Sequence, residues 1–161
     1  MRWIGSSNFS GQEIEAAEEV ARGIGLHRFV SAQNEYSLAE REAEDDVLPA
    51  CERLGIGVLP YFPLASGLLT GKYRLTEQPS EGRLADREIA RDALETVEAL
   101  VDYGESRGIS LLEVAIGALL AEPAISSVIA GATKPEQVHA NVAAAEWKPT
   151  AADMEELRAL L

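Results

Sequence analysis

The chain has 161 residues, of which 47% are hydrophobic, and it carries a formal net charge of -13. This length suits one domain with a single core, so we expect a globular chain rather than a disordered one. The acidic balance argues against nucleic acid and anionic membranes as partners, since both require basic surfaces. The apolar runs are too short to span a membrane and no signal segment opens the chain, so we expect a soluble cytoplasmic protein.

The first part of the chain predicts a strand, a helix and a second strand. Residues 2–5 form the first strand, and the following capping box pairs Ser10 with Glu13. A helix should therefore run over residues 11–25, where apolar residues recur at the helical period. The next apolar run, at residues 29–33, predicts the second strand.

The middle of the chain repeats this order and continues into a long loop. Residues 42–54 predict a helix that stops at Gly55, and residues 57–61 predict a third buried strand. The single cysteine, Cys51, lies on the apolar face of this helix, so we interpret it as a buried structural residue. Residues 62–87 form a loop longer than an ordinary connection, which is typical of a functional segment.

The last part of the chain predicts more helices and one more strand. A helix over residues 87–106 precedes a second capping box, in which Ser110 pairs with Glu113, and the helix that this box begins closes near Pro123. The remaining elements are a strand at 127–130, a helix that opens at 133–136 and continues to 145, and a closing helix at 150–161.

Strands and helices thus alternate along the chain. Helical crossovers join parallel strands with right-handed connections, so the fold class is α/β. Four such units are half of a TIM (β/α)8 barrel, and a closed barrel takes about 250 residues. We therefore expect residues 1–161 to form a single domain, a half-barrel of four parallel strands whose first and fourth strands are open edges.

Short polar segments follow the expected strands, at residues 4–9, 33–36, 61–64 and 129–133. With these segments in this order, residues 3–161 resemble strands five to eight of the aldo-keto reductases, the NADP(H)-dependent carbonyl reductases. The resemblance implies the C-terminal half of that barrel, with NADP(H) as its cofactor. Ligands in such barrels bind at the carboxyl ends of the strands, where these segments stand.

The resemblance places the nicotinamide at the first three segments. It implies that Ser7 and Asn8 hydrogen-bond the nicotinamide carboxamide, that Gln33 makes a second contact with it, and that Tyr61 stacks on the nicotinamide face. The side-chain chemistry agrees with these roles. An amide donates and accepts at once, and a stacked ring fixes which face of the nicotinamide meets the substrate.

The resemblance assigns the rest of the cofactor to two later segments. The loop would fold over the pyrophosphate, and the helix start near Lys134 would hold the adenosine 2′-phosphate, because free backbone N–H groups and a lysine attract an anion. Gln137 and Asn141 would address the adenine, and Gln137 stands where many relatives have arginine, which leaves NADP against NAD open. The residues implied are Phe62, Pro63, Leu64, Ser66, Gly67 and Lys72 in the loop, then Gly131, Thr133, Lys134, Gln137 and Asn141.

Each of these residues has a simpler interpretation when it is taken alone. Asn8 would begin a turn, Tyr61 would pack in the core, and Thr133 would cap a helix. Their joint occurrence at successive strand ends favours a ligand site. His27 is interpreted as structural and His139 as solvated, and neither has a carboxylate or cysteine at ligand spacing, so no metal site is expected.

The chemical step of the family needs groups that this sequence lacks. Hydride transfer to a carbonyl leaves an alkoxide that must be protonated. The aldo-keto reductases use an Asp, a Tyr, a Lys and a His on strands two to four for this work, and Tyr36, Tyr73 and Tyr103 have no such neighbours here. We assign no catalytic residue and expect an NADP(H)-binding half that is inactive without an N-terminal half. A separately encoded half, an internal or misassigned start in a longer gene, and a cut half-barrel all fit this sequence.

A non-catalytic alternative uses the open strand edges. Edge strands pair readily with other strands, so the chain would be a binding or assembly module that forms a homodimer or joins an N-terminal half-barrel. A fragment that cannot fold is a third interpretation. The substrate stays unassigned, because loops from both halves line the substrate pocket in the family.

Overall fold

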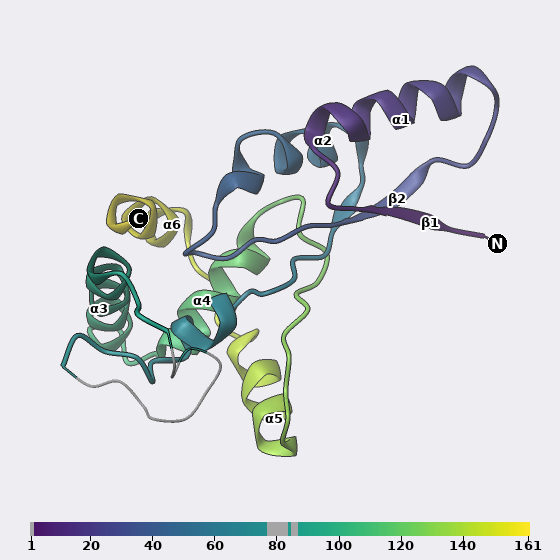
Figure 1. Ribbon diagram of the computed structural model, residues 1–161. Coiled ribbons are helices and arrows are strands. Elements are labelled where there is room, and N and C mark those ends of the chain that lie inside the picture. Colours follow the sequence, from purple (N-terminus) through teal and green to yellow (C-terminus); the bar gives the residue numbers. More distant parts are fainter. Residues whose placement is uncertain (1, 77–83, 85–86) are drawn as a thin grey trace.

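The computed structural model describes residues 2–76, 84 and 87–161 (Figure 1). Its elements are β1 (Ile4–Ser7), α1 (Gly11–Gly23), β2 (Phe29–Gln33), the 3-10 helix η1 (Glu42–Glu44), α2 (Val47–Leu54), β3 (Gly57–Val58), the 3-10 helix η2 (Ala65–Thr70), α3 (Arg91–Glu105), α4 (Leu111–Ala121), α5 (Pro135–Ala144) and α6 (Ala151–Leu160). No helix in the described ranges is long and apolar enough to cross a membrane.

A parallel sheet of three strands, in the order β1-β2-β3, forms the centre of the first half of the chain. β2 has the bounds that the sequence predicts, whereas β1 begins at Ile4 rather than residue 2. The helices α1 and α2 lie over the same face of this sheet (Figure 1), and Ala32 and Val58 are fully buried in one cluster with Ile14 and Cys51. The parallel pairing confirms the α/β class.

The four-strand expectation is corrected by the segment after α4. Within the described residues, 127–130 form no strand, and the chain meets the β3 region in parallel only at two residue pairs, Val58 with Ile125 and Tyr61 with Ile129. Pro60 lies between these pairs and has no N–H group to donate. Its carbonyl accepts a hydrogen bond from the Ile129 N–H at 2.9 Å. The sheet therefore has three strands and one loosely paired neighbour.

The helix expected over 42–54 is divided around Asp46. η1 ends at Glu44 and α2 begins at Val47, while the Asp46 carboxylate accepts a hydrogen bond from the backbone N–H of Gly11 at 2.7 Å. Asp46 thereby satisfies the first turn of α1 instead of its own helix. A Cβ at Gly11 would lie 2.6 Å from the Asp46 carbonyl oxygen, so this approach requires glycine.

The predicted capping boxes are both present at their helix starts. Ser10 and Glu13 begin α1, and Ser110 and Glu113 begin α4. A further box, which pairs Thr150 with Asp153, begins α6. The helix expected from residue 87 begins instead at Arg91, and the expected loop before it contains η2 and includes residues 77–83, 85 and 86, which lie outside the described residues.

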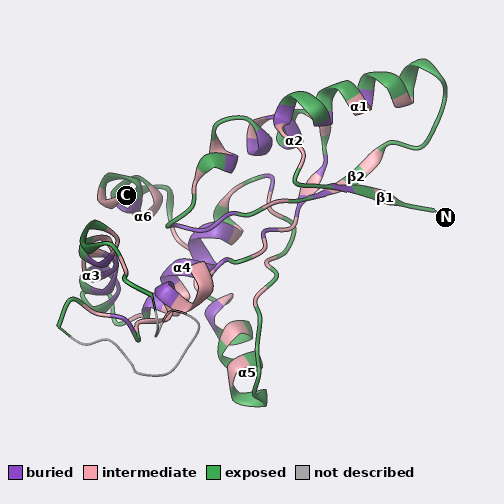
Figure 2. Ribbon diagram, viewed as in Figure 1, coloured by how far each residue is buried: buried purple, intermediate pink, exposed green. Residues whose placement is uncertain are grey.

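The core of the second half is built around α4. Most of α4 is buried (Figure 2), because the helix is apolar apart from Glu113. α3 and α5 pack against α4, and α6 packs against α3. Gly117 in α4 admits Trp147, whose backbone oxygen would lie 3.0 Å from a Cβ at that position.

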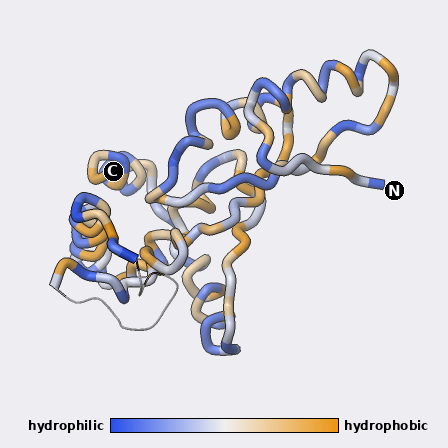
Figure 3. The backbone as a smooth tube through the Cα atoms, viewed as in Figure 1, coloured by the Kyte–Doolittle hydropathy of each residue, from blue (hydrophilic) through white to orange (hydrophobic). Residues whose placement is uncertain are grey.

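One end of the molecule leaves apolar side chains uncovered. The end of α1 and the starts of β1 and β2 project from the rest (Figure 1), and apolar positions mark this region (Figure 3). We call the exposed side chains there the projecting edge: Trp3, Val20, Ile24, Leu26 and Val30. In the described sheet β1 pairs only with β2, so the outer edge of β1 is open. α5 exposes a second apolar pair, Val138 and Val142.

Candidate functional site

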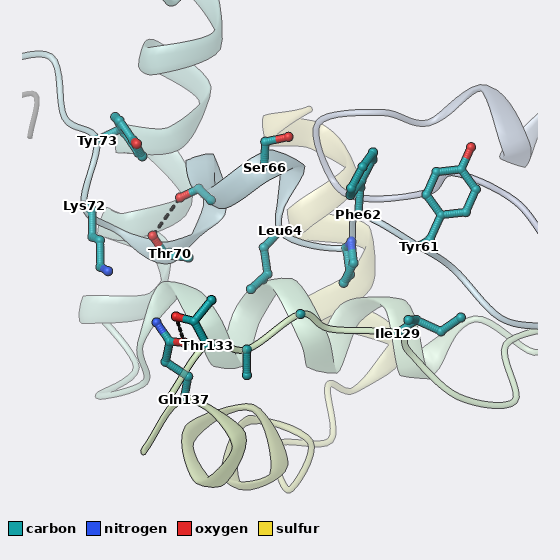
Figure 4. Close-up of a pocket in the computed structure, with 14 residues that line it drawn as sticks. Tyr61, Phe62, Leu64, Ser66, Thr70, Lys72, Tyr73, Ile129, Thr133 and Gln137 are labelled. Atoms are coloured by element: carbon teal, nitrogen blue, oxygen red, sulfur yellow. Dashed lines mark hydrogen bonds between the residues drawn. The ribbon is translucent and has the colours of Figure 1, made fainter. Parts of the chain in front are cut away.

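A cavity of about 640 Å³ lies where the chain after β3 meets the segment between α4 and α5 (Figure 4). Side chains of the loop that contains η2 line one side, and side chains of residues 129–137 line the other. The cavity thus joins segments that are far apart in the sequence. It is larger than a second hollow of about 410 Å³ at the start of α5.

The cavity gathers many of the residues expected to bind the cofactor. These are Tyr61, Phe62, Pro63, Leu64, Ser66, Gly67, Lys72, Gly131, Thr133 and Gln137. The sequence analysis did not select Thr70, Tyr73, Ile129 and Ala132, which also line the cavity, although all four lie inside the loop 62–87 or the segment 129–133. Their position inside these stretches is the sequence signal that could have identified the four residues.

The other expected residues lie beside the cavity or away from it. Lys134 lines a smaller hollow at the start of α5, together with Thr133. Asn141 is half-buried further along α5 and lines neither hollow. Ser7, Asn8 and Gln33 are exposed at the ends of β1 and β2, and Asn8 is connected to the cavity through Tyr61.

Strained backbone marks the same region. The non-glycine residues with positive φ in the described chain are Asn8 (58°), Phe62 (54°), Ala65 (45°) and Ser66 (59°). Residues other than glycine and asparagine avoid this region because the Cβ crowds the following carbonyl, at a cost of about 1–2 kcal/mol each. Such conformations gather at ligand sites, where the surrounding structure enforces them. Their position here agrees with a binding function for the cavity.

The ends of β1 and β2 and the chain after β3 meet at one end of the cavity. The Tyr61 hydroxyl donates a hydrogen bond to Asn8 Oδ1 at 2.8 Å, and the Asn8 backbone N–H donates to the Gln33 carbonyl at 3.0 Å. The Tyr61 ring stands edge-on to Phe62, with 5.3 Å between ring centroids. This end therefore brings the Asn8 amide against the Tyr61 ring, with the exposed residue Gln33 beside Asn8 in the sheet.

The loop after β3 is held by contacts of its own. The Thr70 hydroxyl donates to the Gly67 carbonyl at 2.7 Å, and Gly67 has φ 105°, which glycine adopts without strain. The Tyr73 hydroxyl accepts the Leu84 N–H at 3.3 Å. Lys72 is exposed and lines the cavity, so the loop places an ammonium group on the cavity wall.

The start of α5 is closed by its own glutamine. Gln137 Oε1 accepts from the Thr133 N–H at 2.7 Å, from the Thr133 hydroxyl at 3.1 Å and from the Lys134 N–H at 3.2 Å (Figure 4 marks the Thr133 contact). These are the donors that an anion at this helix start would use. Gln137 thus satisfies the helix terminus, a role the sequence interpretation did not assign to it.

The three tyrosines other than Tyr61 all have hydrogen-bond partners; Tyr73 lines the cavity, whereas Tyr36 and Tyr103 lie elsewhere. The Tyr36 hydroxyl donates to Glu44 at 2.9 Å, and burial together with this carboxylate raises the pKa of Tyr36 far above its ordinary 10.0. The Tyr103 hydroxyl donates to Asp153 at 2.9 Å, and burial raises the pKa of Tyr103 to about 12. The Tyr73 hydroxyl accepts from the Leu84 N–H on the cavity wall, so each of the three hydroxyls has a partner within the chain.

Comparison with known proteins agrees with this geometry. The model of the Aldo/keto reductase family matches residues 1–161. A probable voltage-gated potassium channel subunit beta of Oryza sativa is 36% identical over 154 residues, which cover 90% of this chain and 47% of that protein. An uncharacterized oxidoreductase of Bacillus subtilis is 35% identical over 144 residues, covering 89% of this chain and 44% of the relative.

A third relative carries a more specific name. Versiconal hemiacetal acetate reductase of Aspergillus parasiticus is 29% identical over 165 residues, and the match covers 97% of this chain and 47% of that reductase. The chain therefore spans about half the length of the curated relatives it matches. The family model covers the whole chain and several relatives exceed 30% identity. From its sequence and its fold, the chain belongs to the aldo-keto reductase family of oxidoreductases.

Proposed function

We propose that this chain binds NADP(H) as the cofactor-binding portion of an aldo-keto reductase, with residues 1–161 acting as one domain. The observation that carries the proposal is the meeting of Asn8, Gln33 and Tyr61 at one end of a cavity whose other end reaches α5. A dinucleotide needs an aromatic face and amides for its nicotinamide and cationic groups for its phosphates. The cavity and its surroundings offer both kinds of group.

Local positive charge supports the phosphate end of this proposal. The chain carries a net charge of -13, so an anionic cofactor needs nearby cations to bind. Lys72 lines the cavity, Lys134 stands at the start of α5, and both side chains are exposed. Lysine binds phosphate as a point charge, and a helix start adds partial positive charge. Bound NADPH would supply the hydride for reduction.

We propose that reduction itself needs polypeptide beyond this chain. The alkoxide that hydride transfer produces must take a proton from a positioned acid. The hydroxyls of Tyr36, Tyr73 and Tyr103 are engaged in hydrogen bonds within the chain, which spans about half the length of its curated relatives. The chain's own residues then bind and orient the cofactor, while a second portion of polypeptide donates the proton and helps to bind the substrate.

Titration of the purified chain with NADPH and NADH, followed by calorimetry, tests the proposal. We expect saturable NADPH binding that weakens about ten-fold in Lys134→Ala, as for the loss of a charged phosphate contact. Lys148→Ala is the matched control, because the Lys148 ammonium donates to the Ala145 carbonyl at 2.7 Å, away from the cavity. Absence of binding by a chain with native helical circular dichroism would overturn the proposal.

A second function, assembly through open edges, is favoured by a different observation. β1 has an unpaired edge, and the projecting edge beside it exposes Trp3 by 73% and Ile24 by 65%. Parallel sheets are normally covered on both faces, so these surfaces fit a polypeptide that continues the sheet. The partner we propose is the remaining portion of an aldo-keto reductase, and self-association is the outcome when it is missing.

A further inference from the structure

A hydrogen bond joins the side chains of Tyr61 and Asn8 beside the cavity. The two residues are 53 positions apart in the sequence, and the Tyr61 hydroxyl donates to Asn8 Oδ1 at 2.8 Å. Asn8 is exposed and Tyr61 is half-buried, so water could satisfy both groups if they were apart. Their hydrogen bond is therefore not required to satisfy a buried polar group.

The backbone on both sides of Asn8 is fixed. Asn8 has φ 58°, a left-handed conformation that asparagine tolerates better than most residues, and its N–H donates to the Gln33 carbonyl at 3.0 Å. One residue further on, the Phe9 carbonyl accepts from the Asn34 side-chain amide at 3.0 Å. Only the Asn8 side chain is left to rotate, and it is the part that Tyr61 holds.

Tyr61 is itself held firmly enough to act as a fixed donor. Its backbone N–H donates to the Asn34 carbonyl at 3.0 Å, and its ring stands at 77° to the Phe62 ring. Phe62 has a left-handed φ of 54°, which sets the direction of its ring beside Tyr61. The hydroxyl of Tyr61 thus has a defined position relative to the end of β1.

The consequence concerns which end of the Asn8 amide meets a ligand. An amide carries an accepting oxygen and a donating NH₂ group. Because the oxygen of Asn8 faces Tyr61, the NH₂ group is the end left for a ligand, and a ligand acceptor such as a carbonyl oxygen would match it. A freely rotating amide would present either end and would lose rotamer entropy on binding.

We infer that the Tyr61 hydroxyl is a positioning group that locks the Asn8 amide with its NH₂ group toward the ligand, so that the site selects a carbonyl oxygen. The inference rests on the proposed function, in which the ligand carbonyl belongs to the nicotinamide carboxamide. It goes beyond that function because ring stacking alone needs only an aromatic ring. Phenylalanine in place of Tyr61 keeps the ring and removes the lock.

The binding test uses Tyr61→Phe with NADPH and with 2′-phospho-ADP-ribose, which lacks the nicotinamide. We expect NADPH to bind about five-fold more weakly, as for the loss of one hydrogen bond, while 2′-phospho-ADP-ribose binds unchanged. Tyr103→Phe is the control, because it removes a tyrosine hydrogen bond of 2.9 Å between α3 and α6. Equal NADPH affinity in Tyr61→Phe and the parent would overturn the inference.

A double-mutant cycle shows whether Tyr61 acts through Asn8. Asn8→Gly removes the amide and keeps the left-handed backbone, which alanine would strain. In the Asn8→Gly background, adding Tyr61→Phe should reduce the affinity for NADPH no further. Additive losses would mean that the hydroxyl acts on the cofactor directly, and the positioning role would be abandoned.

A third measurement separates failure of the inference from failure of the proposed function. The ¹H–¹⁵N signals of the Asn8 side-chain NH₂, assigned by their loss in Asn8→Gly, report on its hydrogen bond without any cofactor. They should shift in Tyr61→Phe and stay in place in Tyr103→Phe. If the parent does not bind NADPH, the proposed function fails while these signals still decide the inference, and unmoved signals in Tyr61→Phe would overturn it.

Discussion

At the residue scale, Gln137 competes with any anion for the start of α5. Its amide oxygen accepts from the N–H groups of both Thr133 and Lys134, at 2.7 and 3.2 Å. A 2′-phosphate at this place must displace that oxygen before it reaches the same donors. The side chain thus opposes the preference for NADPH over NADH that the lysine and the helix start would otherwise give.

Replacing Gln137 by alanine should therefore sharpen cofactor preference. Gln137→Ala frees the two backbone donors, so we expect the ratio of NADPH to NADH affinity to rise about five-fold. Calorimetric titration with both cofactors measures the ratio. Gln12→Ala, at an exposed position of α1, is the control. An unchanged ratio in Gln137→Ala would mean that the 2′-phosphate binds elsewhere.

Cys51 provides a readout of the folded state. The side chain is fully buried, and burial, with a smaller effect of Asp46, raises the pKa of its thiol from the ordinary 9.0 to about 11. We expect its reaction with a disulfide reagent at pH 8 to be limited by unfolding, because thiolate and access are both lacking. If the Cys51 thiol reacted as fast in native buffer as in urea, the packing around α2 would be contradicted.

The site could be predicted from the sequence only to the level of segments. The resemblance to the aldo-keto reductases pointed to Tyr61, Thr133 and Lys72, and all three line the cavity. Tyr61 and Thr133 also follow expected strands, where ligands bind in such folds. The direction of an amide does not follow from such a pattern. Whether Gln137 turns to the helix start or to a ligand, and whether Asn8 meets Tyr61, depends on three-dimensional contacts between distant segments.

At the element scale, the Asp153 carboxylate joins α6 to α3, and Glu156 of α6 adds an ion pair with Arg107, just after α3. Asp153 accepts from Thr150 within its own helix start, from the Tyr103 hydroxyl at 2.9 Å and from Arg107. The hydrogen bonds from Thr150, then that from Tyr103, lower the pKa of Asp153 from 3.8 to about 2. The ionised form is therefore the one that the folded state stabilises.

This pKa predicts how acid affects the docking of α6. A depressed pKa gives stability that is present above pH 3.8 and lost as the pH falls toward 2. We expect Asp153→Asn to be less stable in urea than the parent at pH 6, with the difference shrinking between pH 4 and pH 2. Asp45→Asn, at an exposed position between η1 and α2, is the control. A difference independent of pH would show that the charge of Asp153 is unimportant.

Elements with local signals could be predicted, and those set by distant contacts could not. The capping boxes at Ser10 and Ser110 place α1 and α4 because the hydrogen bonds involved span a few residues. The break before α2 depends on Asp46 meeting Gly11 from another helix. Pro60 limits the fourth strand only because its missing N–H faces that neighbour, which the sequence pattern does not reveal.

At the scale of the whole molecule, the apolar surface is unevenly covered. α4 is buried among its neighbours, whereas the projecting edge exposes Ile24 and Leu26 by 65% each. Covering each of these side chains would contribute about 1–2 kcal/mol, so the edge is a strong site for association. The net charge of -13 opposes close contact between two copies, so association of the chain with itself should be weaker than association with a less acidic partner.

Sedimentation of the chain with and without a partner decides between these outcomes. Without a partner, the chain should associate with itself in a concentration-dependent way. Ile24→Gln with Leu26→Gln should weaken this association, and also weaken capture of a co-expressed N-terminal portion from the related Bacillus subtilis oxidoreductase, by about 30-fold. Leu75→Gln, an exposed leucine outside the projecting edge, should change neither. If the chain stays monomeric and captures no partner, the projecting edge is stable when exposed to solvent, and the proposal of assembly through it is wrong.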